Sequence, residues 1–167
     1  RKKMNIEEIK EYVKNKHEGQ RRKQGTPYYL HPYAVAEMLK NKGFGEDYQA
    51  TGLLHDTLED TNATKEEILK LTNENILGTV VLVTKEQGYN MQEYYERIMN
   101  SDMARMVKLA DRWHNLSESA MASYLFKQKY IKETEKWYLK MAEGTCLEEE
   151  IKSELIKLKD SIKINKQ

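Results

Sequence analysis

The sequence is poor in the residues that mark disulfide-rich, turn-rich and membrane-spanning proteins. It has one cysteine, Cys146, with two prolines and eight glycines among 167 residues. One cysteine cannot form an internal disulfide, which suits a reducing compartment, and scarce glycine and proline disfavour a turn-rich all-β fold. No apolar run approaches the roughly 20 residues of a membrane helix, and no apolar signal segment opens the chain. We therefore expect a cytoplasmic, helical protein with no membrane partner.

Charge is balanced overall but unevenly distributed. The 28 basic and 27 acidic residues give a net charge of +1, which provides no general attraction to nucleic acids or membranes. Residues 1–23 hold nine basic and four acidic side chains, whereas residues 44–74 hold eight acidic and two basic ones. These two regions are either solvated helix faces or the two sides of a site where acids hold a metal and bases hold an anion.

Apolar residues recur at helical spacing almost throughout the chain. We expect one domain over 1–167, with a core of about 5–142 and a C-terminal helix of about 146–163. The expected helices begin near residue 5 and near Pro32, then cover about 47–60, a short stretch after Thr64, 76–84, 90–100, 101–118 and 121–142. The last stripe, from Leu147 to Ile162, should dock on the core or on a second subunit.

The segment from Leu54 to Asp60 is the first candidate for chemistry. If 47–60 forms one helix, His55 and Glu59 share a face, as do Asp56 and Asp60, because residues four apart are neighbours on a helix. Three carboxylates this close repel one another, and a divalent cation would compensate their charge. Imidazole with carboxylate suits Mn, Fe or Zn. The alternative is an acidic surface patch with an incidental histidine.

A second segment carries Asp111 on a predicted helix. Asp111 follows Ala110 near the apolar face, where an unpaired carboxylate would be costly, and Asn115 lies one turn later on the same side. The alternative is a surface ion pair between Asp111 and Arg105 or Arg112.

The third segment places three consecutive bases, residues 21–23, before a Gly-Thr-Pro turn and His31. Arginine forks and lysine ammonium groups are suited to phosphate, and arginine also stacks on flat rings. The alternative is a solvent-exposed basic loop.

In this order the three segments resemble the HD superfamily of metal-dependent phosphohydrolases, and in particular the hydrolase domain of RelA/SpoT-type alarmone enzymes and their small stand-alone relatives. The similarity covers roughly Ile6 to Leu116. The matching runs are RKQGTPYYLHP at 22–32, LLHDTLEDT at 53–61, and VKLAD at 107–111 followed by Asn115.

The resemblance implies an all-α, HD-domain helical bundle that removes pyrophosphate from the 3′ position of ppGpp or pppGpp and yields GDP or GTP. A metal, usually Mn in this family, would be bound by four side chains: His31, His55, Asp56 and Asp111. Glu59 and Asp60 match the catalytic acidic pair, and the nucleotide-binding positions are Arg22, Lys23 and Asn115. The length leaves no room for a synthetase domain, so the resemblance implies a hydrolase only, with a nucleotide and no nucleic acid as its partner.

The chain departs from the family pattern at Ser117 and Glu118, where the long enzymes usually carry Arg and Thr. Glu118 adds negative charge near a polyphosphate, which leaves the choice between guanine and adenine nucleotides open. Two alternatives also stay open: an HD phosphohydrolase that acts on another nucleotide, and a catalytically silent nucleotide sensor.

Overall fold

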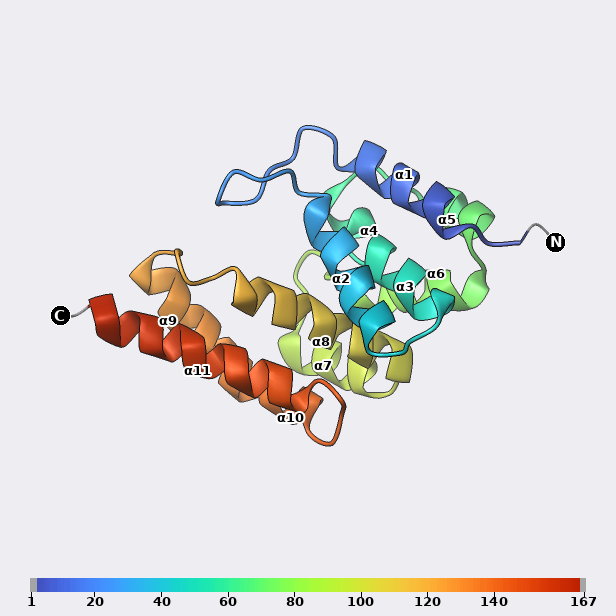
Figure 1. Cartoon of the computed structure of the whole chain (residues 1–167). Helices are drawn as coiled ribbons and strands as arrows, with labels where there is room; N and C mark the ends of the chain where they lie inside the picture. The colour runs from blue at the N-terminus through green and yellow to red at the C-terminus, as the bar shows by residue number, and fades with distance from the viewer. Residues whose placement is uncertain (1–2, 166–167) are drawn as a thin grey trace. The chain divides into compact units, whose positions relative to one another are not determined.

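A computed structural model describes residues 3–165, and this part of the chain consists of helices and loops (Figure 1). Its only strand-like feature is an isolated antiparallel bridge between Arg21 and Pro27. The expectation of an all-α fold is therefore confirmed. The structure divides into two compact units, 1–108 and 109–167, and the single domain over 1–167 stays a prediction. No helix within the described residues is long and apolar enough to cross a membrane.

The first unit contains seven complete helices and the beginning of an eighth. Polar side chains cap several of them; Thr64 and Glu67, for example, form a reciprocal capping box. The elements are α1 (Ile6–Lys16), α2 (Leu30–Asn41), α3 (Glu46–Leu54), α4 (Thr57–Asp60), α5 (Lys65–Leu71), α6 (Glu74–Val83), α7 (Met91–Met99) and α8 (Asp102–Ser117). Helix α2 thus begins two residues before Pro32, and the helix expected over 76–84 corresponds to α6.

Close packing of α2 against α3 is possible because Gly52 lies at their contact. A Cβ atom on Gly52 would lie 3.1 Å from Leu39 Cδ1 and 3.3 Å from Val35 Cγ1. Both of these neighbours are fully buried, so the missing side chain brings the two helices together. This packing sets the distance between the N-terminal end of α2 and the C-terminal end of α3.

The predicted helix over 47–60 is wrong, because the chain breaks at His55 and Asp56. Helix α3 ends at Leu54, α4 begins at Thr57, and Asp56 has φ −115° and ψ 7°. His55 Nδ1 contacts the Gly52 carbonyl at 2.6 Å, and the Thr57 hydroxyl donates to the Leu54 carbonyl at 2.8 Å. These side chains compete with the backbone for carbonyl groups at the helix end. The argument that His55, Asp56, Glu59 and Asp60 share faces of one helix therefore fails.

The second unit contains the rest of α8 and the C-terminal helices. They are α9 (Tyr124–Glu133), a π-helical turn η1 (Thr134–Tyr138), α10 (Leu139–Ala142) and α11 (Glu148–Asn165). The helix predicted over 121–142 is thus interrupted by the π turn. Helix α11 packs against α9 and α10. Its buried side chains include Ile151, Leu155 and Leu158, and Leu147, which directly precedes the helix, is also buried. The last apolar stripe therefore docks within the unit.

Candidate metal centre

Two buried histidines come from the ends of α2 and α3. His31 is the second residue of α2, His55 directly follows α3, and their ring centroids lie 5.4 Å apart. Only 1% of His31 and 5% of His55 is exposed. Because His55 Nδ1 faces the Gly52 carbonyl at 2.6 Å, it carries the proton, and Nε2 is the nitrogen that can offer a lone pair. Such a contact commonly fixes the tautomer of a metal-ligating histidine.

Asp111 joins these histidines through α8, which runs unbroken from Asp102 to Ser117. It lies one turn beyond the fully buried Val107, on the same helix face. One ligand atom from each of His31, His55 and Asp111 lies within 4.8 Å of the others. Three of the four predicted ligands are thus brought together, and two imidazoles with a carboxylate fit a divalent transition-metal ion.

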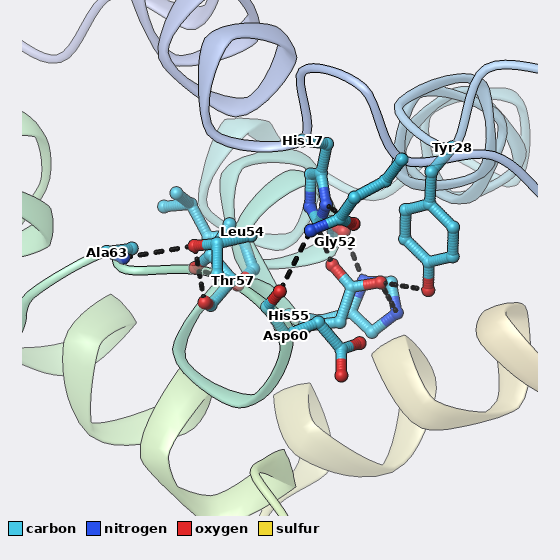
Figure 2. Close-up of polar contacts among 11 residues, drawn as sticks. His17, Tyr28, Gly52, Leu54, His55, Thr57, Asp60 and Ala63 are labelled. Carbon is cyan, nitrogen blue, oxygen red and sulfur yellow. Dashed lines mark hydrogen bonds and ion pairs between the residues drawn. The ribbon is translucent and has the colours of Figure 1, made fainter.

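Asp56, the fourth predicted ligand, lies beside this cluster without belonging to it. Its Oδ2 lies 3.8 Å from His55 Nε2 and accepts a 2.6 Å hydrogen bond from the Tyr28 hydroxyl. Its Oδ1 is buried 3.3 Å from His17 Nε2, without a well-aligned hydrogen bond. Burial acts to raise the pKa of Asp56, but His55, His17 and Tyr28 outweigh it and hold the pKa well below its usual range. Figure 2 shows His17, Tyr28 and His55 pointing toward one another.

The two acids of α4 lie in different surroundings. Glu59 is exposed, and its Oε1 accepts a 2.7 Å hydrogen bond from the Lys85 backbone N–H, in the loop after α6. Asp60 also lies at the surface, yet surrounding atoms shield part of its carboxyl group. This shielding raises the pKa of Asp60 to about 6, and the negative charges of Asp56 and Glu59 add to the shift. Of the two, Asp60 is the one suited to exchanging a proton near neutral pH.

The basic loop is a tight, hydrogen-bonded turn. The backbone N–H of Arg22 donates to Thr26 at 2.8 Å, and that of Gly25 donates to Arg22 at 2.8 Å. Gly25 has φ +96°, a conformation that favours glycine. The Arg22 guanidinium lies 5.8 Å from the Tyr28 ring centroid, while Lys23 is exposed. Tyr28 therefore connects this loop to Asp56.

Asn115 contacts the candidate ligand Asp111 directly. Its Nδ2 donates to Asp111 Oδ1 at 3.2 Å. Arg112, the alternative partner considered for Asp111, is instead paired with Glu133. The Arg112 guanidinium also lies between the rings of Tyr130 and Tyr138, at 4.0 and 3.8 Å from their centroids. Asp111 and Arg112, although adjacent in sequence, thus have separate surroundings.

Sequence reasoning missed His17 and assigned no role to Tyr28. Only 1% of His17 is exposed, and its Nδ1 lies 2.8 Å from Gln20 Oε1. Burial acts to lower the pKa of His17, but Asp56 and Gln20 outweigh it, so the pKa lies above its usual value. The only signal in the sequence was a pair of polar residues, three apart, at the end of the first helix. Nothing in their spacing indicated that they reach Asp56.

Comparison with known proteins gives these residues a family context. The chain matches the HD domain family over residues 10–145. It is 34% identical over 145 residues to guanosine-3′,5′-bis(diphosphate) 3′-pyrophosphohydrolase of Aquifex aeolicus, covering 82% of this chain and 21% of the relative. It is 36% identical over 137 residues to a probable enzyme of the same name from Synechocystis, covering 75% of this chain and 18% of the relative. The chain thus spans about a fifth of the length of these relatives.

A solved structure is similar over nearly the whole chain. It is described as a metazoan ortholog of SpoT that hydrolyzes ppGpp and has a role in starvation responses. The TM-score is 0.79 at 25% identity, and the match covers 94% of this chain and 97% of the other. The family match includes His31, His55, Asp56 and Asp111. By sequence and by fold, the chain belongs to the HD domain family.

Proposed function

We propose that this chain hydrolyses ppGpp or pppGpp to GDP or GTP and pyrophosphate. The observation that carries the proposal is the cluster of His31, His55 and Asp111 beside Asp56, in a chain whose relatives bear that activity in their names. The proposed reaction takes place in the cytoplasm. This compartment suits a chain whose single cysteine, Cys146, is exposed and forms no disulfide.

The proposed metal is Mn²⁺, held by His31, His55, Asp56 and Asp111. Imidazole and carboxylate ligands suit it, and Asp56 Oδ1, which has no well-aligned hydrogen bond, adds an oxygen donor beside the histidines. When bound, the cation supplies Lewis acidity, which polarises a phosphoryl oxygen and lowers the pKa of water toward about 7.

In this proposal Asp60, one of the two acids of α4, transfers the proton. Asp60 accepts a proton from the water that attacks the phosphorus atom bonded to the 3′ oxygen. The bond between that phosphorus and the 3′ oxygen then breaks, and Asp60 returns the proton to the departing ribose oxygen. A pKa of about 6 suits both steps near neutral pH. Glu59 supplies the second acidic group and, by accepting a hydrogen bond from the Lys85 N–H, connects α4 to the loop after α6.

Arg22, Lys23 and Asn115 bind the nucleotide in the same proposal. Arg22 presents a planar fork next to the Tyr28 ring, which suits a phosphate or the flat face of a base. Lys23 is an exposed cation in the same turn. Asn115, oriented by Asp111, is suited to hydrogen bonds with the sugar or a phosphate oxygen.

The test is an assay of purified protein with Mn²⁺ and a panel of nucleotides. The panel contains ppGpp, pppGpp, their adenine analogues, GTP and GMP. Released pyrophosphate is measured, the remaining nucleotides are separated by chromatography, and Asp111→Asn is the matched inactive control. We expect pyrophosphate from the 3′-pyrophosphorylated nucleotides and none from the control. Turnover of GTP or GMP alone would instead support a different HD phosphohydrolase. Nucleotide binding without any turnover would support a sensor.

A further inference from the structure

The strongest unassigned feature of the first unit is a chain of polar contacts that begins at the surface and ends on the buried Asp56. The backbone carbonyl of Asp60 accepts a 2.9 Å hydrogen bond from Gln20 Nε2. Gln20 Oε1 lies 2.8 Å from His17 Nδ1, and His17 Nε2 lies 3.3 Å from Asp56 Oδ1. The chain thus connects α4, the end of α1 and the candidate metal ligand (Figure 2).

The direction of these contacts follows from the Gln20 amide. Its Nε2 donates to a carbonyl group, so its Oε1 faces His17 and can only accept. His17 Nδ1 must therefore be the donor in that contact. The remaining ring nitrogen, Nε2, faces a carboxylate oxygen that can only accept as well. Acceptors therefore face both edges of the imidazole: Gln20 Oε1 accepts from Nδ1, and Asp56 Oδ1 lies 3.3 Å from Nε2 without a well-aligned hydrogen bond.

Packing holds the ring in the same position. Only 1% of His17 is exposed, and its ring lies 4.9 Å from the Tyr28 ring, centroid to centroid. The Tyr28 hydroxyl donates to the other oxygen of Asp56, so the two rings lie beside the two oxygens of one carboxylate. Outer residues that orient a ligating carboxylate commonly contribute about 10- to 100-fold in metal affinity.

We propose that His17 is a positioning residue that orients Asp56 for metal binding, with Gln20 holding its far edge. His17 is not among the residues that the metal cluster brings together, so it acts through Asp56 and does not ligate the ion. The inference rests on the proposed metal centre and goes beyond it, because it assigns a role to a residue outside the ligand set.

Two substitutions of His17 provide a matched test. A glutamine places its amide nitrogen near the Nε2 position and keeps a donor to Asp56, whereas an asparagine places it near Nδ1 and keeps only the contact with Gln20. Metal-free His17→Gln, His17→Asn and unaltered protein are titrated with Mn²⁺, and free Mn²⁺ is followed by electron paramagnetic resonance. We expect His17→Asn to weaken Mn²⁺ binding by about 10- to 100-fold and His17→Gln to bind nearly as the unaltered protein does.

The melting temperature of each metal-free variant distinguishes a positioning role from a structural one. If His17 were merely structural, both substitutions would lower the melting temperature, and glutamine would not restore Mn²⁺ binding. Unchanged Mn²⁺ affinity in His17→Asn, or equal losses in both variants, would overturn the proposal. If His17→Asn does not fold, Gln20→Leu takes its place. We expect weaker Mn²⁺ binding from it, and an unchanged affinity would count against the proposal. Failure of the unaltered protein to bind Mn²⁺ would overturn the metal centre itself.

Discussion

The two units each bury a charged side chain, and they stabilise it in different ways. In the second unit Arg112 is 4% exposed and lies between two tyrosine rings while it pairs with Glu133. In the first unit Asp56 is 7% exposed, and one of its oxygens has no well-aligned hydrogen bond. Arg112 is enclosed by groups from its own unit, and its buried Nε, which also has no hydrogen-bond partner among the described residues, is a donor that cannot bind a cation. Asp56 retains an oxygen that can bind a cation, as is typical of a metal-binding site.

Among substitutions that distinguish the two buried charges, Asp56 and Arg112, we expect the largest effect from Asp56→Asn. This substitution removes the charge but keeps the volume and an acceptor for the Tyr28 hydroxyl. Metal catalysis supplies several kcal/mol of transition-state stabilisation, and each 1.36 kcal/mol is tenfold in rate. If the chain hydrolyses ppGpp with Mn²⁺ as proposed, we therefore expect this turnover to fall by about 1000-fold, together with Mn²⁺ binding. Full activity in this variant would remove Asp56 from the site.

The next effect is expected from Arg112→Met, which should act on stability and leave the metal centre intact. Removing one partner of a fully buried ion pair costs about 3–5 kcal/mol. Because 32% of the Glu133 side chain is exposed, we expect a smaller loss, roughly 2–3 kcal/mol in the free energy of unfolding, measured by urea denaturation. The Mn²⁺ dissociation constant should not change. A loss of metal affinity as large as that of Asp56→Asn would show that Arg112, like Asp56, contributes to metal binding.

The smallest effect concerns Asp60, whose pKa is raised from 3.8 to about 6 in the folded protein. Between these values the folded state binds more protons than the unfolded state, so this group lowers stability as pH rises from about 4 to about 6. Asp60→Asn removes that loss. The metal-free variant should therefore melt slightly higher than the unaltered protein at pH 7, and the difference should vanish near pH 4. An equal difference at both pH values would show that Asp60 titrates normally.

The sequence was sufficient to predict the helical class and to single out the three segments that carry the candidate site. Apolar spacing predicted the last stripe, and the motif residues His31, His55 and Asp111 do come together. The sequence did not predict the break between α3 and α4. The break arises because the side chains of His55 and Thr57 compete with backbone N–H groups for the carbonyls of Gly52 and Leu54.

His17 illustrates a different limit of sequence reasoning. Its partner Asp56 is 39 positions away along the chain, so no local periodicity connects them. The π turn at Thr134–Tyr138 was missed for a related reason. It lies where Tyr138 reaches Arg112, and that contact depends on tertiary packing that helix propensity does not encode.

The hydrogen-bonded turn from Gln20 to Tyr28 has a consequence for the kinetics of association. The backbone N–H of Tyr28 donates to the Gln20 carbonyl at 2.9 Å, which closes the loop around the inner contacts of Arg22. The loss of backbone entropy in this segment is thus completed when the chain folds, and it is not repeated each time an anion arrives. If Arg22 and Lys23 bind the nucleotide as proposed, its phosphates meet cations on a turn that is already hydrogen-bonded, so the association rate should depend on diffusion and ionic strength rather than on loop ordering.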